Sequence, residues 1–288
     1  MVVDAHVNIW NEEDVLPLFY DQLRRVRPGE MSHRADADAI HAAMSNVDRA
    51  VVFPISYADT IGIESSDETS AAAVAMYPDK LIGFCYVDPR RSDYMERLRY
   101  AVEELGLVGV KYGPIYNGVH LHDPRMDPVY EYCQRNDLPL TMHMGTTYTQ
   151  HSPIDLGRPI HADEVAERYP DLKMILAHMG HPWYEDCIAV VRKRPNVYCE
   201  VAAIYYRPWQ FYNVLVTAEE YRMADKIFFG TDFPFAGVEE SIEGIRAVNK
   251  IAEGTSLPRV SDETIEGIIN SNPFLHWWHD SDPLRTRE

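Results

Sequence analysis

The feature that most constrains this chain is a regular alternation of short apolar runs with helical patterns along almost its whole length. Eight runs have the length and the near-continuous apolar character of parallel strands that are buried on both faces. They cover residues 2–6, 49–55, 80–87, 107–112, 138–144, 172–179, 196–202 and 226–232. Amphipathic helical patterns lie between them, at residues 36–47, 92–105, 124–136, 161–169, 183–194, 209–223 and 237–252. Eight such strands with intervening helices predict an α/β protein with a (β/α)8 TIM-barrel fold.

The rival architecture is an open, doubly wound parallel sheet. Such a sheet normally carries a glycine-rich phosphate loop after its first strand, and the stretch DAHVNIW at residues 4–10 contains no glycine. The chain has 288 residues and no linker rich in proline, glycine or serine. We therefore expect one barrel domain over residues 1–280 and a flexible tail over residues 281–288.

Two segments are longer than a minimal barrel requires. Residues 10–35 follow the first predicted strand, and residues 145–160 follow the fifth. Loops after barrel strands lie on the face where barrel enzymes build their sites, so both segments are candidate lids.

The charge balance restricts the possible partners. The net charge is −18, from 27 Lys and Arg residues against 45 Asp and Glu residues, which argues against nucleic acid or an anionic membrane as a partner. The start, MVVDAHVNIW, lacks the basic and apolar regions of a signal peptide, and no apolar run approaches the length of a membrane span. The four cysteines are scattered without CxxC spacing. These features predict a cytoplasmic protein with free thiols that acts on a small molecule.

Polar side chains stand where the apolar runs end. Asp4 and His6 end the first run, His143 the fifth, His178 the sixth and Asp232 the eighth. The carboxyl ends of barrel strands converge on one axis, so these side chains form one predicted cluster of imidazoles and carboxylates. Such groups suit zinc, manganese or iron, and Asp232 suits the role of general base for a metal-activated water.

Other polar residues near these strand ends admit two interpretations each. Lys111 is either a salt-bridge partner for the carboxylates or a direct participant, and Glu200 could orient a histidine from outside the metal's ligands. His181 is expected in the turn formed by HPW at residues 181–183. A single histidine at a strand end is more often a packing residue than a ligand, but a whole buried ionisable cluster is costly without a cation.

The motifs in their order resemble a known family. The stretches VVDAHVNIW, GVKYGPIY, LPLTMHMG, PDLKMILAHMGHPW, RPNVYCEV and KIFFGTDFPF resemble the amidohydrolase superfamily, in its amidohydrolase-2 branch of metal-dependent TIM-barrel enzymes. The resemblance covers about residues 1–275. The branch includes hydrolases and non-oxidative decarboxylases of hydroxybenzoates and related acids.

The resemblance implies metal ligation by the first strand, by His143 and by Asp232. It implies that His178 either binds a second metal or acts on substrate and water, so that one or two divalent ions are expected per chain. Most members have HxH on the first strand, whereas this chain has His6-x-Asn8. Some decarboxylases of the branch have a carboxylate-x-His pair there, which Asp4-x-His6 matches.

The resemblance leaves two reactions open. Hydrolysis of an amide, lactone, ester or thioester by a metal-activated water is the branch's default. Decarboxylation of an aromatic or unsaturated acid is the alternative, and Arg158 and Arg207 could then hold an anionic substrate. Aromatic loops at residues 180–186 and 203–212 suit a planar substrate or a homodimer contact. A barrel that binds without catalysis is the third hypothesis, which the combination of His143, His178 and Asp232 disfavours.

Overall fold

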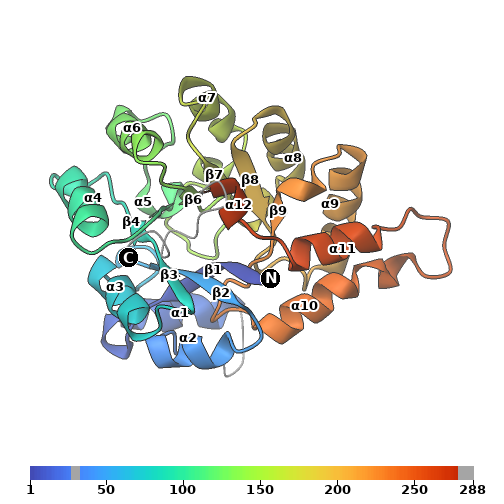
Figure 1. The fold of residues 1–288 in the computed structure, drawn as a ribbon, viewed down its shortest axis with the longest axis horizontal. Coiled ribbons are helices and arrows are strands. Elements are labelled where there is room, and N and C mark those ends of the chain that lie inside the picture. Colours follow the sequence, from blue (N-terminus) through green and yellow to red (C-terminus); the bar gives the residue numbers. More distant parts are fainter. Residues whose placement is uncertain (27–32, 278–288) are drawn as a thin grey trace.

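The strands of the computed structural model, which describes residues 1–26 and 33–277, form a parallel barrel surrounded by helices (Figure 1). The strands in the described ranges are β1 (Val3–Ile9), β2 (Arg49–Pro54), β3 (Leu81–Gly83), β4 (Cys85–Tyr86), β5 (Val110–Tyr112), β6 (Leu140–Met142), β7 (Met174–Leu176), β8 (Val197–Glu200) and β9 (Ile227–Phe228). Each of the eight predicted runs overlaps a strand, and the third contains two short ones; β1 continues to Ile9, beyond the predicted end of its run at residue 6. The predicted fold class is therefore confirmed.

The hydrogen-bonded strand order explains how the barrel closes. One sheet has the order β1-β2-β3 and the other has the order β4 to β9, and every pair is parallel. Phe84 lies between β3 and β4, and its N–H donates to the Val52 carbonyl oxygen at 2.8 Å. At the other seam the Ala5 N–H donates to the Phe229 carbonyl oxygen at 3.0 Å, so β1 and β9 meet and the chain closes on itself.

The helices surround the strands, most of them on the outside of the barrel, while the last, Phe274–Trp277, closes one end of the interior. They are α1 (Pro17–Val26), α2 (Ala37–Ala43), α3 (Asp67–Met76), α4 (Tyr94–Glu103), α5 (Pro114–Asn117), α6 (Asp127–Arg135), α7 (His161–Arg168), α8 (Tyr184–Lys193), α9 (Pro208–Glu220), α10 (Val238–Arg246), α11 (Asp262–Ile269) and α12 (Phe274–Trp277). Short 3-10 helices also occur, of which η2 (Pro124–Met126), η3 (Ile154–Gly157) and η4 (Ala177–Gly180) matter below. Each predicted helical stretch contains a helix.

The sequence patterns did not reveal α1, α3, α5, α11 or α12. The predicted lid at residues 10–35 contains α1, and α3 occupies the stretch between β2 and β3. The helix α3 begins after Ser66, whose side chain accepts from the Thr69 N–H at 3.3 Å and so caps the helix. Its apolar residues are mostly alanines, which give a weak helical periodicity.

A separate apolar cluster fills the inside of the barrel. Side chains from β2, β7 and β9, which are not neighbours in the sheets, meet in it, so they must point toward the barrel axis. Phe53, Ile175 and Phe228 are members, and Trp277 of α12 closes the cluster at one end. The barrel interior is therefore a packed core rather than a channel.

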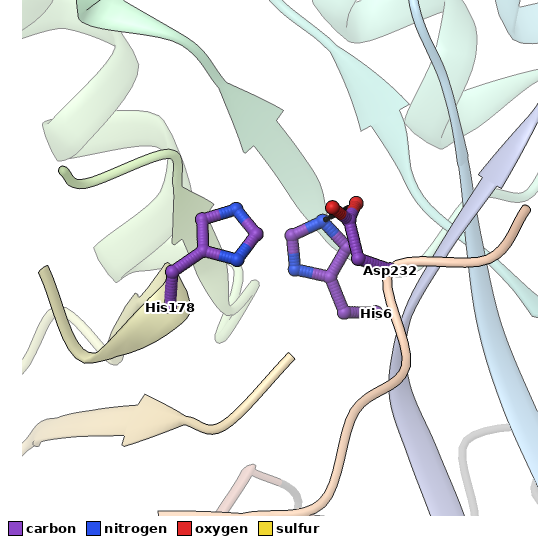
Figure 2. Close-up of side chains that lie close together, drawn as sticks. All are labelled: His6, His178 and Asp232. Atoms are coloured by element: carbon purple, nitrogen blue, oxygen red, sulfur yellow. Dashed lines mark ion pairs between the residues drawn. The ribbon is translucent and has the colours of Figure 1, made fainter. Parts of the chain in front are cut away.

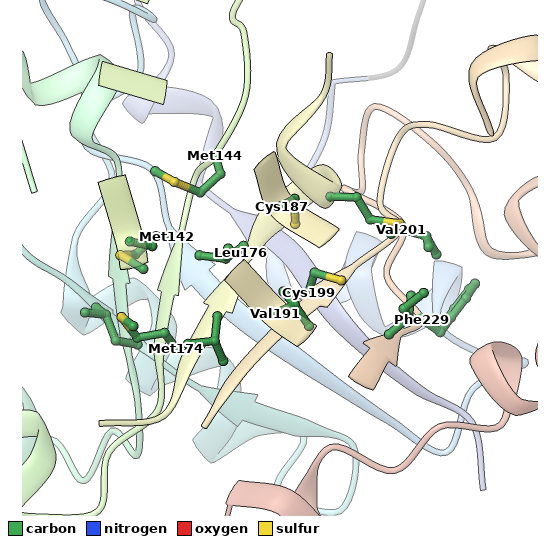
Figure 3. Close-up of a cluster of buried hydrophobic side chains, with 14 of the residues drawn as sticks. Met142, Met144, Met174, Leu176, Cys187, Val191, Cys199, Val201 and Phe229 are labelled. Carbon is green, nitrogen blue, oxygen red and sulfur yellow. The ribbon is translucent and has the colours of Figure 1, made fainter. Parts of the chain in front are cut away.

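The larger core lies between the strands and the helices. Figure 3 shows one part of it, where Met142, Met174, Cys187 and Cys199 pack with apolar side chains from β6, β7, β8 and α8. All four cysteines are buried and free, as the sequence predicted. The predicted tail at residues 281–288 lies outside the described residues. In the described part of the chain no helix combines the length and the apolar character that a membrane span needs.

Candidate metal centre and active site

Three predicted site residues come together at one end of the barrel. His6 lies on β1, His178 in η4 directly after β7, and Asp232 after β9. One potential ligand atom from each residue lies within 4.8 Å of the other two. Figure 2 shows the two imidazoles and the carboxylate facing the same space.

Two of these residues have an unusual backbone conformation. His178 has a φ of 56° and Asp232 a φ of 66°, both in the left-handed region that residues other than glycine seldom adopt. Such conformations cost free energy and are concentrated at functional sites. Here they turn the chain sharply after β7 and β9, at the points where both side chains enter the cluster.

Glu200 fixes the orientation of His6. The Glu200 carboxylate is fully buried, and its Oε1 lies 2.9 Å from His6 Nδ1. The same Oε1 accepts from the His178 N–H at 2.8 Å, and Oε2 accepts from the Ala202 N–H. Nε2 of His6 is thereby left to face the cluster, which is the orienting role that the sequence offered for Glu200.

Asp232 is held as a carboxylate. Asn8 donates from Nδ2 to Asp232 Oδ1 at 2.8 Å, and His6 Nε2 lies 3.3 Å from the same oxygen. Burial by itself raises the pKa of Asp232, but the hydrogen bonds from His6 and Asn8 and the charges of His6 and His178 hold that pKa well below its usual range. Asp232 is therefore ionised at neutral pH.

Lys111 brings a cationic group into the same space. Its side chain, on β5, is buried; Nζ lies 3.4 Å from His6 Nε2 and 4.2 Å from the centre of the Phe53 ring. Burial lowers the pKa of Lys111 to about 8, while Glu200 and Asp232 oppose that shift. Glu200 and Asp232 thus favour the charged form of Lys111, which burial disfavours.

His143 adjoins the cluster through His178. Nδ1 of His143 lies 3.2 Å from His178 Nε2, and Nε2 of His143 lies 3.3 Å from the Tyr116 hydroxyl. Burial, with the charges of His178 and Lys111, holds the pKa of His143 well below its usual value. His143 is therefore a neutral imidazole that contacts one of the three central residues, His178.

The structure does not bring Asp4 into the cluster. Asp4 Oδ2 accepts from the Thr231 hydroxyl at 2.7 Å, and Oδ1 accepts from the backbone N–H groups of Thr231 and His6, each at 3.0 Å. Burial raises the pKa of Asp4 to about 7. In a regular strand, side chains two residues apart, such as those of Asp4 and His6, lie on one face. The pairing of β1 with β2 is irregular between Asp4 and Val7, so this alternation is interrupted there. Asp4 instead joins β1 to the segment that carries Asp232.

The cluster opens into a cavity of about 430 Å³ whose walls are largely aromatic and aliphatic. Trp10, Tyr57, Tyr206 and Phe235 belong to the wall, and Arg207, which the sequence suggested as a substrate contact, also lines it. The Tyr57 hydroxyl is buried and makes no hydrogen bond within the described part of the chain. Such a cavity suits a small, partly planar ligand with a few polar atoms.

Arg158 is not among the residues that line this cavity. Its guanidinium donates to Asp186 Oδ2, from Nε at 3.2 Å and from the terminal nitrogen at 2.8 Å. The predicted substrate contact of Arg158 is therefore replaced by an ion pair that joins the segment before α7 to the start of α8.

Two wall residues escaped the sequence analysis. His181 does lie in the HPW turn but also lines the cavity, and its Nδ1 lies 2.6 Å from the Tyr184 hydroxyl. Burial, then the charges of Arg207 and His178, lower the pKa of His181 to about 4. Tyr116 lies in α5, just beyond β5, and only its place after a predicted strand could have indicated it.

The donor set fits a divalent cation. Two imidazole nitrogens and a carboxylate oxygen are ligands that zinc and manganese accept. An acidic partner on the far nitrogen of a ligating histidine is also a regular feature of such sites, and Glu200 supplies it to His6. An ionised Asp232 is in the protonation state that ligation needs. Burial and Lys111 lower the pKa of His6, but Glu200 and Asp232 outweigh them and raise that pKa above its usual value, so a bound cation would compete with a proton on this ring.

Comparison with known proteins gives both a family and a fold. The family model described as Amidohydrolase matches residues 3–274. Among proteins with curated functions, no match to this chain is found. An uncharacterised TIM-barrel protein from Bordetella bronchiseptica superposes with a TM-score of 0.71 at 20% identity, over 94% of this chain and 96% of that one.

Two further structures are similar in fold. A probable 2-pyrone-4,6-dicarboxylic acid hydrolase from Acinetobacter baumannii, with citric acid bound, gives a TM-score of 0.64 at 15% identity, over 96% of this chain and 98% of that one. A dihydroxybenzoic acid decarboxylase from Polaromonas sp. JS666, with bound manganese and the inhibitor 2-nitroresorcinol, gives 0.64 at 17% identity, over 98% of each chain. At these identities the likeness establishes the barrel fold.

Proposed function

The chain belongs to the amidohydrolase family, and from this premise we propose that it is a divalent-metal-dependent hydrolase of a small anionic carbonyl compound. The observation that carries the proposal is the ionised Asp232, which lies 3.3 Å from His6 Nε2 at the floor of the aromatic cavity. A carboxylate in this position can accept a proton from a water molecule that attacks a carbonyl carbon.

The proposed ligands of the ion are His6, His178 and Asp232, with His143 as the fourth candidate. When bound, a divalent ion would polarise the carbonyl group and lower the pKa of water. We also propose one ion per catalytic centre, because three potential ligand atoms lie close together there. The ion is zinc or manganese, and the decarboxylase from Polaromonas binds manganese.

The remaining residues position the reactants. Asp232 would take a proton from the attacking water and return it to the leaving group, so that water adds across the cleaved bond. Glu200 holds His6 in place through the 2.9 Å contact with Nδ1. Lys111 and Arg207, which both line the cavity, would bind the negative charge of the substrate.

The cavity supports a second reaction equally well, the non-oxidative decarboxylation of an aromatic or unsaturated carboxylic acid. Three features favour it: the planar aromatic walls, the buried cation of Lys111, and the Tyr57 hydroxyl, which has no hydrogen-bond partner among the described residues and can bond a ring substituent. In that reaction the bond between the ring and the carboxylate carbon breaks, carbon dioxide leaves, and a proton is delivered to the ring carbon.

A paired substrate panel tests the proposal. The full chain, loaded with zinc or with manganese, would be assayed on lactones, esters and thioesters of small acids and on hydroxybenzoates. Release of acid with no carbon dioxide supports the hydrolase, whereas stoichiometric carbon dioxide from a hydroxybenzoate selects the decarboxylase. A chain that turns over none of these with either metal contradicts both. The homodimer and the cytoplasmic location expected from the sequence remain predictions.

A further inference from the structure

A second cluster of metal-ligand side chains lies apart from the catalytic cavity. His120 lies between α5 and η2, Asp155 in η3, and His161 at the start of α7. None of the three lines the cavity. The segments that carry them follow β5 and β6, so the cluster joins two neighbouring loops at the active-site end of the barrel.

The geometry of this cluster is close to that of a metal site. One potential ligand atom from each of His120, Asp155 and His161 lies within 4.8 Å of the other two. Asp155 Oδ2 is 3.3 Å from His161 Nε2, and tetrahedral zinc with bonds of about 2.0 to 2.1 Å holds its ligand atoms roughly 3.4 Å apart. The Asp155 side chain is 67% exposed, so it can move the remaining distance without disturbing the core.

His161 has a nitrogen that the protein leaves without a hydrogen bond. Its Nε2 is shielded from solvent and has no hydrogen-bond partner in the described part of the chain, although Asp155 is nearby. A buried polar nitrogen without a partner is unfavourable. A cation between His161 and Asp155 would satisfy it.

The neighbouring imidazoles supply and support further ligands. The His120 ring centre lies 4.4 Å from that of His161 and 4.7 Å from that of His122. Burial and the two other imidazoles lower the pKa of His120, which leaves it neutral near pH 7. Ligation through its Nε2 would place the ring proton on Nδ1 and so require loss of the 3.1 Å hydrogen bond that the His122 N–H donates to His120 Nδ1.

Nearby charges favour a cation rather than an anion. Asp155 is a cluster member, and Glu164 Oε2 lies 3.6 Å from His122 Nδ1. The cluster and its surroundings thus present two carboxylates, and the nearby cation, Arg168, has its Nε 4.0 Å from the other oxygen of Glu164. We propose that His120, Asp155 and His161 form a second, structural site for a borderline divalent cation of the zinc class.

The place of the site suggests its role. The loop that follows β6 contributes Thr146, Thr147 and Tyr148 to the cavity wall. Its two ends meet where the Gly145 N–H donates to the Gly157 carbonyl oxygen at 2.6 Å. Asp155 lies just inside this neck and His161 just beyond it, so a bound ion would fasten the wall of the cavity to the segment that carries His120.

Zinc titration of the chelator-treated full chain tests the proposal. Isothermal titration calorimetry of the wild type should show zinc bound beyond the equivalent held at the catalytic centre. His161→Gln and His120→Gln should each lose that additional equivalent or weaken it at least tenfold, and Asp155→Asn should weaken it. His41→Gln is the matched control, because His41 is exposed on α2 and stacked on Tyr77. It should leave the titration unchanged.

Two measurements separate this site from the catalytic one. Asp232→Asn should retain the zinc equivalent that His161→Gln loses, and zinc should raise the Tm of Asp232→Asn but not that of the double variant Asp232→Asn/His161→Gln. Identical zinc stoichiometry and affinity in the wild type, His120→Gln and His161→Gln would overturn the proposal. So would a wild type that binds zinc only at the centre lost in Asp232→Asn. The exposed Asp155→Asn change supplies the test if a histidine variant fails to fold.

Discussion

Glu200 Oε1 lies 2.9 Å from His6 Nδ1 and also accepts the backbone N–H of His178 at 2.8 Å. A single carboxylate oxygen on β8 thus fixes the positions of two residues that come from β1 and from the turn after β7. Glu200 itself does not line the cavity. It is a positioning residue, and the geometry of the candidate metal centre depends on it.

We expect Glu200→Gln to weaken binding of manganese or zinc by about 10- to 100-fold. The side-chain NH2 group of the introduced glutamine would face an N–H group that now donates to a carboxylate oxygen of Glu200. We therefore expect the His6 ring to lose its fixed orientation. The measurement is competition with a chromophoric chelator, together with kcat as a function of metal concentration. Restoration of most of kcat at high metal concentration is expected, and Glu103→Gln, an exposed change, is the control. Unaltered metal affinity in Glu200→Gln would show that this contact is not what orders the site.

Lys111→Met should change binding of substrate and of metal in opposite directions. The ammonium group lies 3.4 Å from His6 Nε2, so it repels a cation and attracts an anion. We expect KM for anionic substrates to rise at least tenfold, KM for neutral analogues to change little, and affinity for manganese to increase. Steady-state kinetics on a matched pair of charged and neutral substrates, with a metal titration, measures these effects. Equal changes in KM for both substrates would argue against charge recognition by Lys111.

Gly157→Ala should open the neck of the loop that forms one cavity wall. An added Cβ would lie 1.9 Å from the Gly145 carbonyl oxygen, so the backbone must move, at a cost of about 1 to 3 kcal/mol. We expect a lower Tm, a higher KM and faster proteolysis within residues 145–157. Gly267→Ala is the control, because a Cβ there meets nothing within 4 Å in α11. A Gly157→Ala protein that matches wild type in all three measurements would contradict the close backbone contact between Gly145 and Gly157.

Asp67 should give the fold a pH-dependent stability. Its carboxylate at the start of α3 is 1% exposed and accepts the Tyr86 N–H at 2.9 Å. Burial raises its pKa from 3.8 to about 6. The folded chain therefore binds more protons than the unfolded chain between pH 4 and pH 6, roughly, and this residue's contribution to the free energy of unfolding falls as the pH rises through that window.

Asp67→Asn removes this titration and keeps an oxygen for the Tyr86 N–H. We expect the variant to be more stable than wild type by up to about 3 kcal/mol at pH 7, and to lose that advantage at pH 4. Urea unfolding across this pH range measures the difference, with the exposed Asp21→Asn as the control. A stability difference that does not vary with pH would exclude this account of Asp67.

The sequence was informative about strand ends because buried parallel strands are nearly pure apolar runs. A polar residue that interrupts such a run is conspicuous, and this is how His6, His178 and Asp232 were identified. The fold class followed from the same runs. The barrel then brings together strand ends that are far apart in the sequence, so the sequence alone predicts that the three residues form one group.

The other site assignments depended on details that periodicity does not contain. Asp4 was expected beside His6, but the irregular pairing between Asp4 and Val7 breaks the alternation, and the carboxylate bonds to Thr231 instead. Arg158 was assigned to substrate binding from its charge and loop position alone, but its guanidinium forms an ion pair with Asp186. His181 and Tyr116 enter the cavity from a turn and a short helix, where no strand-like pattern marks the direction of a side chain.

We propose that His6, His178 and Asp232 hold the catalytic metal. The most direct test is metal content per chain, measured by inductively coupled plasma mass spectrometry after reconstitution with manganese or zinc, for the wild type and for Asp232→Asn, together with turnover of the best substrate in the panel. We predict that Asp232→Asn stays folded, holds about one equivalent less than the wild type, and has lost at least 1,000-fold in kcat, an effect of the size that loss of an essential group produces. Equal metal content in the two proteins, with turnover retained in Asp232→Asn, would contradict the claim.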